Sequence, residues 1–205
     1  MTALSQFCKG PTEAHWQAVK RVFRYLRGTV DHGLTYKGTG SPKELPVLHG
    51  YCSDSDYAED ETDRRSVTGY TFILSGAAIS WASRKQPTVA HSSTEAEYMA
   101  ASDAAKEAVW WRLFLSCLGY PMDDATSILS DNQGSIALSK NPEGHRRVKH
   151  IGVRHHYIRE QVAKGALTLD YVSTTKMAAD VLTKALSATQ HIATCKLLGI
   201  AFPTA

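Results

Sequence analysis

Apolar residues recur along this chain with two different periods, and each change of period marks a change of predicted element. Residues 11–29 (PTEAHWQAVKRVFRYLRGT) carry large apolar side chains at helical spacing, with a proline near the start and a glycine near the end. The members of this stripe are Trp16, Val19, Val22, Phe23 and Leu26. We therefore predict a helix here, followed by a linker at residues 39–46 (TGSPKELP).

Beyond the linker the pattern becomes that of strands. Residues 47–55 (VLHGYCSDS) form a short strand-like run that ends in carboxylates, and residues 66–83 contain two β-rich runs around Ser75-Gly76, which predicts a hairpin. Residues 93–118 then predict a long alanine-rich helix. Its apolar surface is expected to be Val109, Trp110, Leu113, Phe114 and Leu118, and Trp81, Trp111, Tyr70 and Phe72 are also expected in the core.

The remaining segments alternate between strands and helices. Strand patterns are found at residues 126–130 (TSILS) and 166–172 (ALTLDYV), and helical patterns at 131–140, 153–165 and 173–186. The resulting order is three strands, helix, strand, helices, strand, helix. This order predicts an α/β fold, a mixed sheet that opens with an antiparallel meander and is flanked by helices.

Length and composition add limits to this picture. A chain of 205 residues with 43% apolar residues is enough for one well-packed domain and an appendage. No window approaches 18 uncharged apolar residues, and the first ten residues lack the apolar core of a signal peptide. We therefore expect a soluble, cytoplasmic chain with no membrane partner.

Charge is unevenly distributed along the chain, although the net charge is only +3. Residues 139–160 hold six lysines and arginines and four histidines against Glu143 and Glu160, whereas residues 54–63 (DSDYAEDETD) are acidic. Such a separation is typical of a protein that holds cations in one place and phosphates in another. Solvated charged faces remain the alternative.

Four carboxylates lie where predicted elements meet. Asp54 closes the first strand, Glu97 begins the long helix, Asp131 follows the fourth strand, and Asp180 lies in the last helix. In open α/β sheets such positions gather at one site. Grouped carboxylates require cations, and Mg²⁺ prefers oxygen ligands. Two such ions about 3.5–4 Å apart can activate a water and stabilise the leaving oxygen of a phosphodiester.

Two of the candidate acids have neighbours that could take their place. In SSTEAEYMA (residues 92–100), Ser92 and Glu95 have the spacing of a capping box, which leaves Glu97 without a local role. Asp56 remains an alternative to Asp54, because two residues along a strand return to the same face.

Several long motifs resemble one family. Residues 51–115 resemble the ribonuclease H domain of copia-type LTR retrotransposons, and SDNQGSIALSKNP, VKHIGVRHHYIRE and YVSTTKMAADVLTKAL continue the likeness in the family's order. Residues 11–29 resemble the stretch that links reverse transcriptase to ribonuclease H in that family. The match runs from about Gly10 to Leu186.

The resemblance implies a ribonuclease H-like five-stranded sheet and a site formed by Asp54, Glu97, Asp131 and Asp180. It further implies two Mg²⁺ ions, for which Mn²⁺ may substitute, and hydrolysis of the RNA strand of RNA–DNA hybrids. The expected partner is the reverse transcriptase domain of the same polyprotein, in a cytoplasmic virus-like particle.

The resemblance also suggests domain boundaries. Residues 1–46 are expected to be the end of the reverse transcriptase connection, 47–186 the ribonuclease H domain and 187–205 a helical tail, with Met1 an added start.

Residues around this site are candidates for substrate binding. Ser92, Asn132 and Gln133 flank it and could read a ribose 2′-hydroxyl, although turn or capping roles remain open. The basic segment is expected to follow the phosphate backbone, with Arg146, Arg147, Lys149, His150, Arg154 and His156 as its contacts. A zinc site is disfavoured there, because the histidines lack paired cysteines and have cationic neighbours.

The sequence departs from the family at three places. VSTTKMAAD holds no histidine before its Asp, Gly152 replaces the family's usual Asp, and Tyr57 replaces its usual Trp. The motif YPMDD (residues 120–124) is one residue too long for a polymerase signature. Two alternatives stay open: a non-catalytic nucleic-acid-binding or connection module, and an integrase- or transposase-like DNA nuclease of the same fold.

Overall fold

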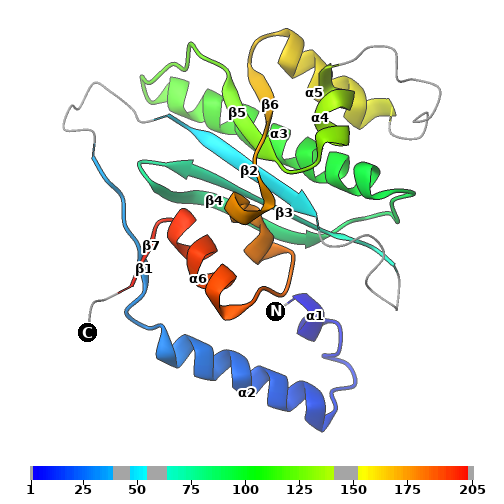
Figure 1. Ribbon diagram of the computed structural model, residues 1–205, viewed down its shortest axis with the longest axis vertical. Helices are drawn as coiled ribbons and strands as arrows, with labels where there is room; N and C mark the ends of the chain where they lie inside the picture. Colours follow the sequence, from blue (N-terminus) through cyan, green and yellow to red (C-terminus); the bar gives the residue numbers. More distant parts are fainter. Residues whose placement is uncertain (1, 39–46, 55–63, 141–151, 203–205) are drawn as a thin grey trace.

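A five-stranded mixed sheet forms the centre of the computed structural model, which describes residues 2–38, 47–54, 64–140 and 152–202 (Figure 1). The strands lie in the order β4-β3-β2-β5-β6. They are β2 (His49–Asp54), β3 (Val67–Leu74), β4 (Ala77–Lys85), β5 (Thr126–Ser130) and β6 (Leu167–Tyr171). The first three are antiparallel, and β5 and β6 run parallel to β2, which confirms the predicted meander and fold class.

The hairpin between β3 and β4 turns where the sequence predicts it. Ser75 and Gly76 have φ values of 56° and 80°, the pair of positive angles that a two-residue turn requires to follow the twist of its strands. Glycine adopts such an angle without steric cost. The local sequence therefore fixes the register of this antiparallel pair.

The long helix α3 (Ser93–Cys117) packs on one face of the sheet through small residues. Ala101, Ala104 and Ala108 are fully buried, and their size lets the helix lie close to Leu48 and Phe72 of the sheet.

The aromatic residues of the chain divide between core and surface. Tyr70 and Phe72 are buried as predicted, but Trp81 and Trp110 are 59% and 51% exposed. The prediction that Leu113 and Leu118 belong to the packed face of α3 is also wrong, because both side chains are exposed. The face of α3 that contacts the sheet is formed by alanines and not by these larger residues.

Helices α4 (Gln133–Lys140) and α5 (Gly152–Ala163) lie on the same side of the sheet as α3, and α6 (Ala188–Leu197) lies on the other (Figure 1). The two sides have separate cores. Ile158 of α5 belongs to the large core under α3, whereas Ile73 of β3 packs with Ala178 and Leu198 on the opposite face.

The continuous helix predicted at residues 173–186 is wrong in detail. Two short 3₁₀ helices, η3 (Thr174–Lys176) and η4 (Ala178–Leu182), replace it. Met177 separates them with an extended backbone (φ −78°, ψ 99°) and buries its side chain to 1% exposure. Burial of this side chain overrides the helical pattern of the segment, which then winds tightly over the end of β2.

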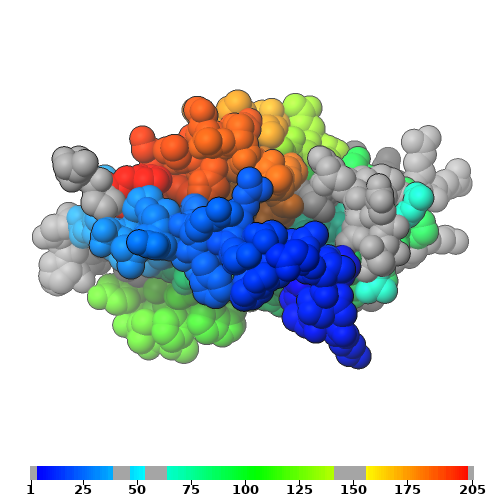
Figure 2. Space-filling model, turned by 90° about the horizontal axis from the view of Figure 1, so that it is seen from below, coloured from blue at the N-terminus to red at the C-terminus, as the bar shows by residue number. Residues whose placement is uncertain are grey.

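A segment near the N-terminus and the C-terminal tail pair outside the central sheet. The predicted first helix is confirmed as α2 (Glu13–Gly28), preceded by α1 (Thr2–Ser5). Within α2, which is described throughout, no residue is buried, and Figure 2 shows this helix lying on the outside of the molecule. Strand β1 (Gly33–Leu34) pairs with β7 (Ile200–Ala201), so the N-terminal segment contacts the C-terminal tail.

The domain boundaries stay a prediction. Of the helices in the described ranges, none combines the length and apolar character needed to cross a lipid bilayer.

The close pairing of β2 and β3 gives a test of the core. A Cβ on Gly50 would lie 2.6 Å from the Phe72 ring, which is fully buried and has no room to shift. Gly50→Ala should therefore lower the free energy of unfolding by about 1–3 kcal/mol, measured by urea denaturation.

Gly33→Ala is the matched control, because a Cβ there meets nothing within 4 Å. It should change the free energy of unfolding by less than about 0.5 kcal/mol. Equal effects of the two substitutions would contradict this description of the core.

Candidate functional site

Asp180 in η4 is held against the end of β2. Its carboxylate is 5% exposed, and its Oδ1 accepts a hydrogen bond from the Ser53 hydroxyl at 2.7 Å. Ser53 is fully buried and directly precedes Asp54 in β2. This hydrogen bond joins residues 127 positions apart, so it places η4 beside the carboxyl end of the strand.

Asp131 lies at the neighbouring strand end. It follows β5 directly, and its Oδ2 accepts a hydrogen bond at 2.9 Å from the hydroxyl of Thr174 in η3. Because β2 and β5 are parallel, with Tyr51 paired to Leu129, their carboxyl ends leave the same edge of the sheet. Asp54, the last residue of β2, and Asp131 therefore follow adjacent strand ends.

Lys184 contacts Asp180, and its pKa reflects the charges of three of the candidate acids. Its Nζ donates to Asp180 Oδ1 at 3.3 Å. Burial alone lowers the pKa of this ammonium, but the negative charges of Asp180, Asp131 and Glu97 outweigh that effect and raise it above the ordinary lysine value. Three carboxylates from separate elements thus act on one cation.

The start of α3 separates the roles of its two glutamates. Ser92 Oγ accepts from the Glu95 backbone N–H at 3.1 Å, and Glu95 Oε2 accepts from the His91 N–H at 2.7 Å. Glu95 is therefore a cap, as predicted, although it reaches the residue before the N-cap and not the N-cap itself. Glu97 lies two residues further along the helix, at 5% exposure, and its negative charge contributes to the raised pKa of Lys184.

The structure describes the backbone of Asp54 but not its side chain, and Asp56 lies outside the described residues. Among the side chains that are described, no group of three or more His, Cys, Asp or Glu residues is arranged to hold a metal ion. The candidate residues nevertheless suit Mg²⁺, because carboxylate oxygens are its preferred ligands. One of these carboxylates, that of Asp180, already binds a positive charge, the ammonium of Lys184.

Of the three polar residues predicted to contact the substrate, two are helix N-caps and one is exposed. Asn132 Oδ1 accepts from the Ser135 N–H at 2.9 Å, the geometry of an N-cap for α4. Ser92 is the N-cap of α3. Gln133, the first residue of α4, is exposed beside Asp131 and is available to a ligand.

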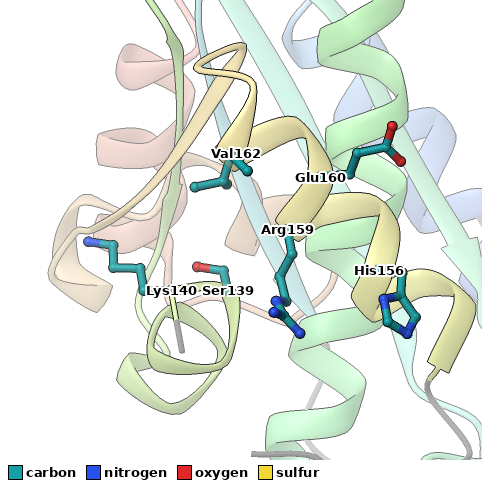
Figure 3. Close-up of a pocket in the computed structure, with 7 residues that line it drawn as sticks. Ser139, Lys140, His156, Arg159, Glu160 and Val162 are labelled. Atoms are coloured by element: carbon teal, nitrogen blue, oxygen red, sulfur yellow. The ribbon is translucent and has the colours of Figure 1, made fainter. Parts of the chain in front are cut away.

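A basic hollow of about 490 Å³ lies between α4 and α5 (Figure 3). Lys140 of α4 and His156 and Arg159 of α5 line it, and Figure 3 shows the Arg159 side chain extending from α5 into the space beside α4. Glu160 of α5 also lines it, and its carboxylate pairs with Lys164. The hollow provides cationic groups where the sequence predicts phosphate contacts.

Five predicted contacts cannot be placed in this way. Arg146, Arg147, Lys149 and His150 lie outside the described residues, and Arg154 is described only as part of the α5 backbone.

Ser53 and Lys184 are site residues that the sequence analysis missed. Lys184 follows Asp180 by four positions, a spacing that could have indicated a pair on a helical segment. Ser53 carries no such signal, because its partner is distant in the sequence.

Comparisons with known proteins agree with this architecture. No model of a known protein family matches the chain. The chain is 45% identical over 181 residues to the retrovirus-related Pol polyprotein from transposon TNT 1-94 of Nicotiana tabacum, covering 88% of this chain and 13% of that protein. It is also 45% identical over 184 residues to the corresponding polyprotein from transposon RE2 of Arabidopsis thaliana, covering 90% of this chain and 12% of that protein.

Among solved structures, RNase H1 from the archaeon Halobacterium salinarum matches with a TM-score of 0.50 at 15% identity, covering 67% of this chain and 94% of that one. This likeness shows the fold. The chain spans only about an eighth of the length of the Pol polyproteins it matches. The chain belongs to the Pol polyproteins of copia-type retrotransposons, as a segment with the ribonuclease H fold.

Proposed function

We propose that this chain is a Mg²⁺-dependent ribonuclease H that hydrolyses the RNA strand of RNA–DNA hybrids during retrotransposon reverse transcription. The observation that carries the proposal is the placing of Asp180 and Asp131 at two neighbouring strand ends, where Ser53 holds Asp180 beside the end of β2 and Thr174 holds Asp131 after the parallel strand β5. Polyprotein relatives at 45% identity support the setting, and the ribonuclease H fold supports the class of reaction.

In this proposal Asp54, Glu97, Asp131 and Asp180 hold two Mg²⁺ ions, for which Mn²⁺ may substitute. The ions would supply activation of water and stabilisation of the leaving oxygen. Ser53 orients Asp180 and Thr174 orients Asp131 through their hydrogen bonds, so both carboxylates are fixed before substrate arrives. Such preorganisation lowers the barrier, because the charges need not reorient during reaction.

The basic hollow would hold the phosphate backbone of the hybrid. Lys140 ends α4, which begins two residues after Asp131, so one helix connects the acidic site to the hollow. Gln133, exposed at the start of that helix, is the residue best placed to meet a ribose 2′-hydroxyl. The reverse transcriptase of the same polyprotein is the proposed partner, in a cytoplasmic virus-like particle.

A gel assay with a labelled RNA–DNA hybrid, beside RNA–RNA and DNA–DNA duplexes, tests the proposal directly. The enzyme should remove only the RNA strand of the hybrid, in Mg²⁺ and not in EDTA. Binding of the hybrid without cleavage would identify a non-catalytic module instead. Cutting of duplex DNA would identify an integrase- or transposase-like nuclease.

Asp54→Asn should lower the rate of hybrid cleavage at least roughly a hundredfold, because a metal site loses one of its charged ligands. Affinity for the hybrid, measured by fluorescence anisotropy, should change little.

Asp103→Asn is the control for this variant. Asp103 lies on α3, pairs with Lys106 at 3.1 Å and is placed outside the acidic site. Its substitution should leave the cleavage rate unchanged. Full activity of Asp54→Asn would remove Asp54 from the proposed site and make Asp56 the next candidate.

Lys140→Gln should weaken hybrid binding and reduce the slope of log affinity against log salt concentration by about one, because one phosphate contact is lost. Lys196→Gln is the control, since Lys196 is exposed on α6, away from α4 and α5. Anisotropy titrations at several salt concentrations measure both slopes. A slope unaffected by Lys140→Gln would exclude the hollow as a phosphate site.

A further inference from the structure

Lys184 is fixed in the acidic site by its backbone as well as by its side chain. Its N–H donates to the backbone oxygen of Asp180 at 2.8 Å, and its Nζ donates to the carboxylate of the same residue at 3.3 Å. The turn after η4 therefore presents the ammonium to Asp180.

The environment of this pair differs from that of an ordinary surface ion pair. The side chains of Lys184 and Asp180 are 22% and 7% exposed, whereas those of Lys164 and Glu160, a pair with the same i,i+4 spacing, are 59% and 57% exposed. Surface pairs contribute little to stability. An ammonium this far removed from water requires a nearby negative charge to compensate the loss of hydration, and the Asp180 carboxylate supplies it at 3.3 Å.

We propose that Lys184 is a positioning residue that acts as the protein's own counter-ion for the carboxylate cluster, holding Asp180 in the absence of metal and giving way when a divalent cation binds. This inference rests on the proposed metal site. It follows from the contact of the ammonium with Asp180, one of the carboxylates that would hold the metal. A divalent cation must then compete with Lys184 for Asp180, so the lysine stabilises the metal-free protein and weakens metal binding.

Isothermal titration calorimetry with Mg²⁺, combined with thermal unfolding in EDTA, tests the inference without any measure of cleavage. Lys184→Met removes the charge and keeps the apolar stem. It should bind Mg²⁺ about threefold to tenfold more tightly than the natural chain, because one charged hydrogen bond no longer has to be broken. Its unfolding temperature in EDTA should be lower, and Mg²⁺ should raise it by a larger amount.

Two variants separate charge from contact. Lys184→Arg keeps the cation and should retain the natural Mg²⁺ dissociation constant to within about twofold. Ser53→Ala removes the other hydrogen bond to Asp180 Oδ1 without changing the charge, and it should not tighten Mg²⁺ binding. If Lys184→Met does not fold, as judged by circular dichroism, Lys184→Gln carries the same test.

An unchanged or weaker affinity for Mg²⁺ in the folded neutral variants would overturn the inference and leave the proposed nuclease intact. Tighter binding in Ser53→Ala would overturn it as well, because the effect would then come from a lost contact and not from a lost charge. A natural chain that binds no Mg²⁺ would instead overturn the proposed metal site. The two failures are therefore distinguishable.

Discussion

Carboxylates gathered at one end of a sheet repel one another, and the surroundings of this site are arranged to contain that repulsion. Asp180 is almost fully buried, where the charged form is disfavoured unless hydrogen bonds or cations stabilise it. Ser53 and Lys184 supply one of each to the same oxygen. Thr174, in the neighbouring segment, donates a hydrogen bond to Asp131.

The fold makes this arrangement possible through the change of strand direction beside β2. This strand pairs antiparallel with β3 and parallel with β5, so the ends of β2 and β5 point to the same edge. The 3₁₀ segments η3 and η4 then cover that edge and carry Thr174 and Asp180 to it. Met177, which separates them, is buried to 1% exposure.

The sequence predicts the elements better than it predicts their surfaces. The order of elements along the chain, the Ser75-Gly76 hairpin and the extent of α3 follow from local signals that the tertiary structure does not override. The side of α3 that contacts the sheet is not local information. Apolar size favours Trp110 and Leu113, but close packing selects the alanines, because only small side chains let the helix approach.

In the candidate site, too, contacts between residues distant in the sequence could not be predicted. Asp54, Glu97, Asp131 and Asp180 are recognisable because each occupies a motif at the end or start of an element. Ser53 and Thr174 are recognisable only from the tertiary structure, since their hydrogen-bond partners are 127 and 43 residues away. Sequence reasoning thus proposes the carboxylates of the site but misses Ser53, Thr174 and Lys184, the residues that contact them.

The helix α4 resolves the conflict between an acidic site and a polyanionic substrate. Asp131 lies two residues before the first residue of this helix of 8 residues and Lys140 ends it, so the helix alone separates them by roughly 12 Å along its axis. The screening length at physiological ionic strength is about 8 Å, and the carboxylates therefore only weakly reduce the attraction of a phosphate to the hollow. Helix α4 keeps the acidic site and the basic hollow close enough to contact the same nucleic acid. It also keeps them far enough apart that their charges do not neutralise each other.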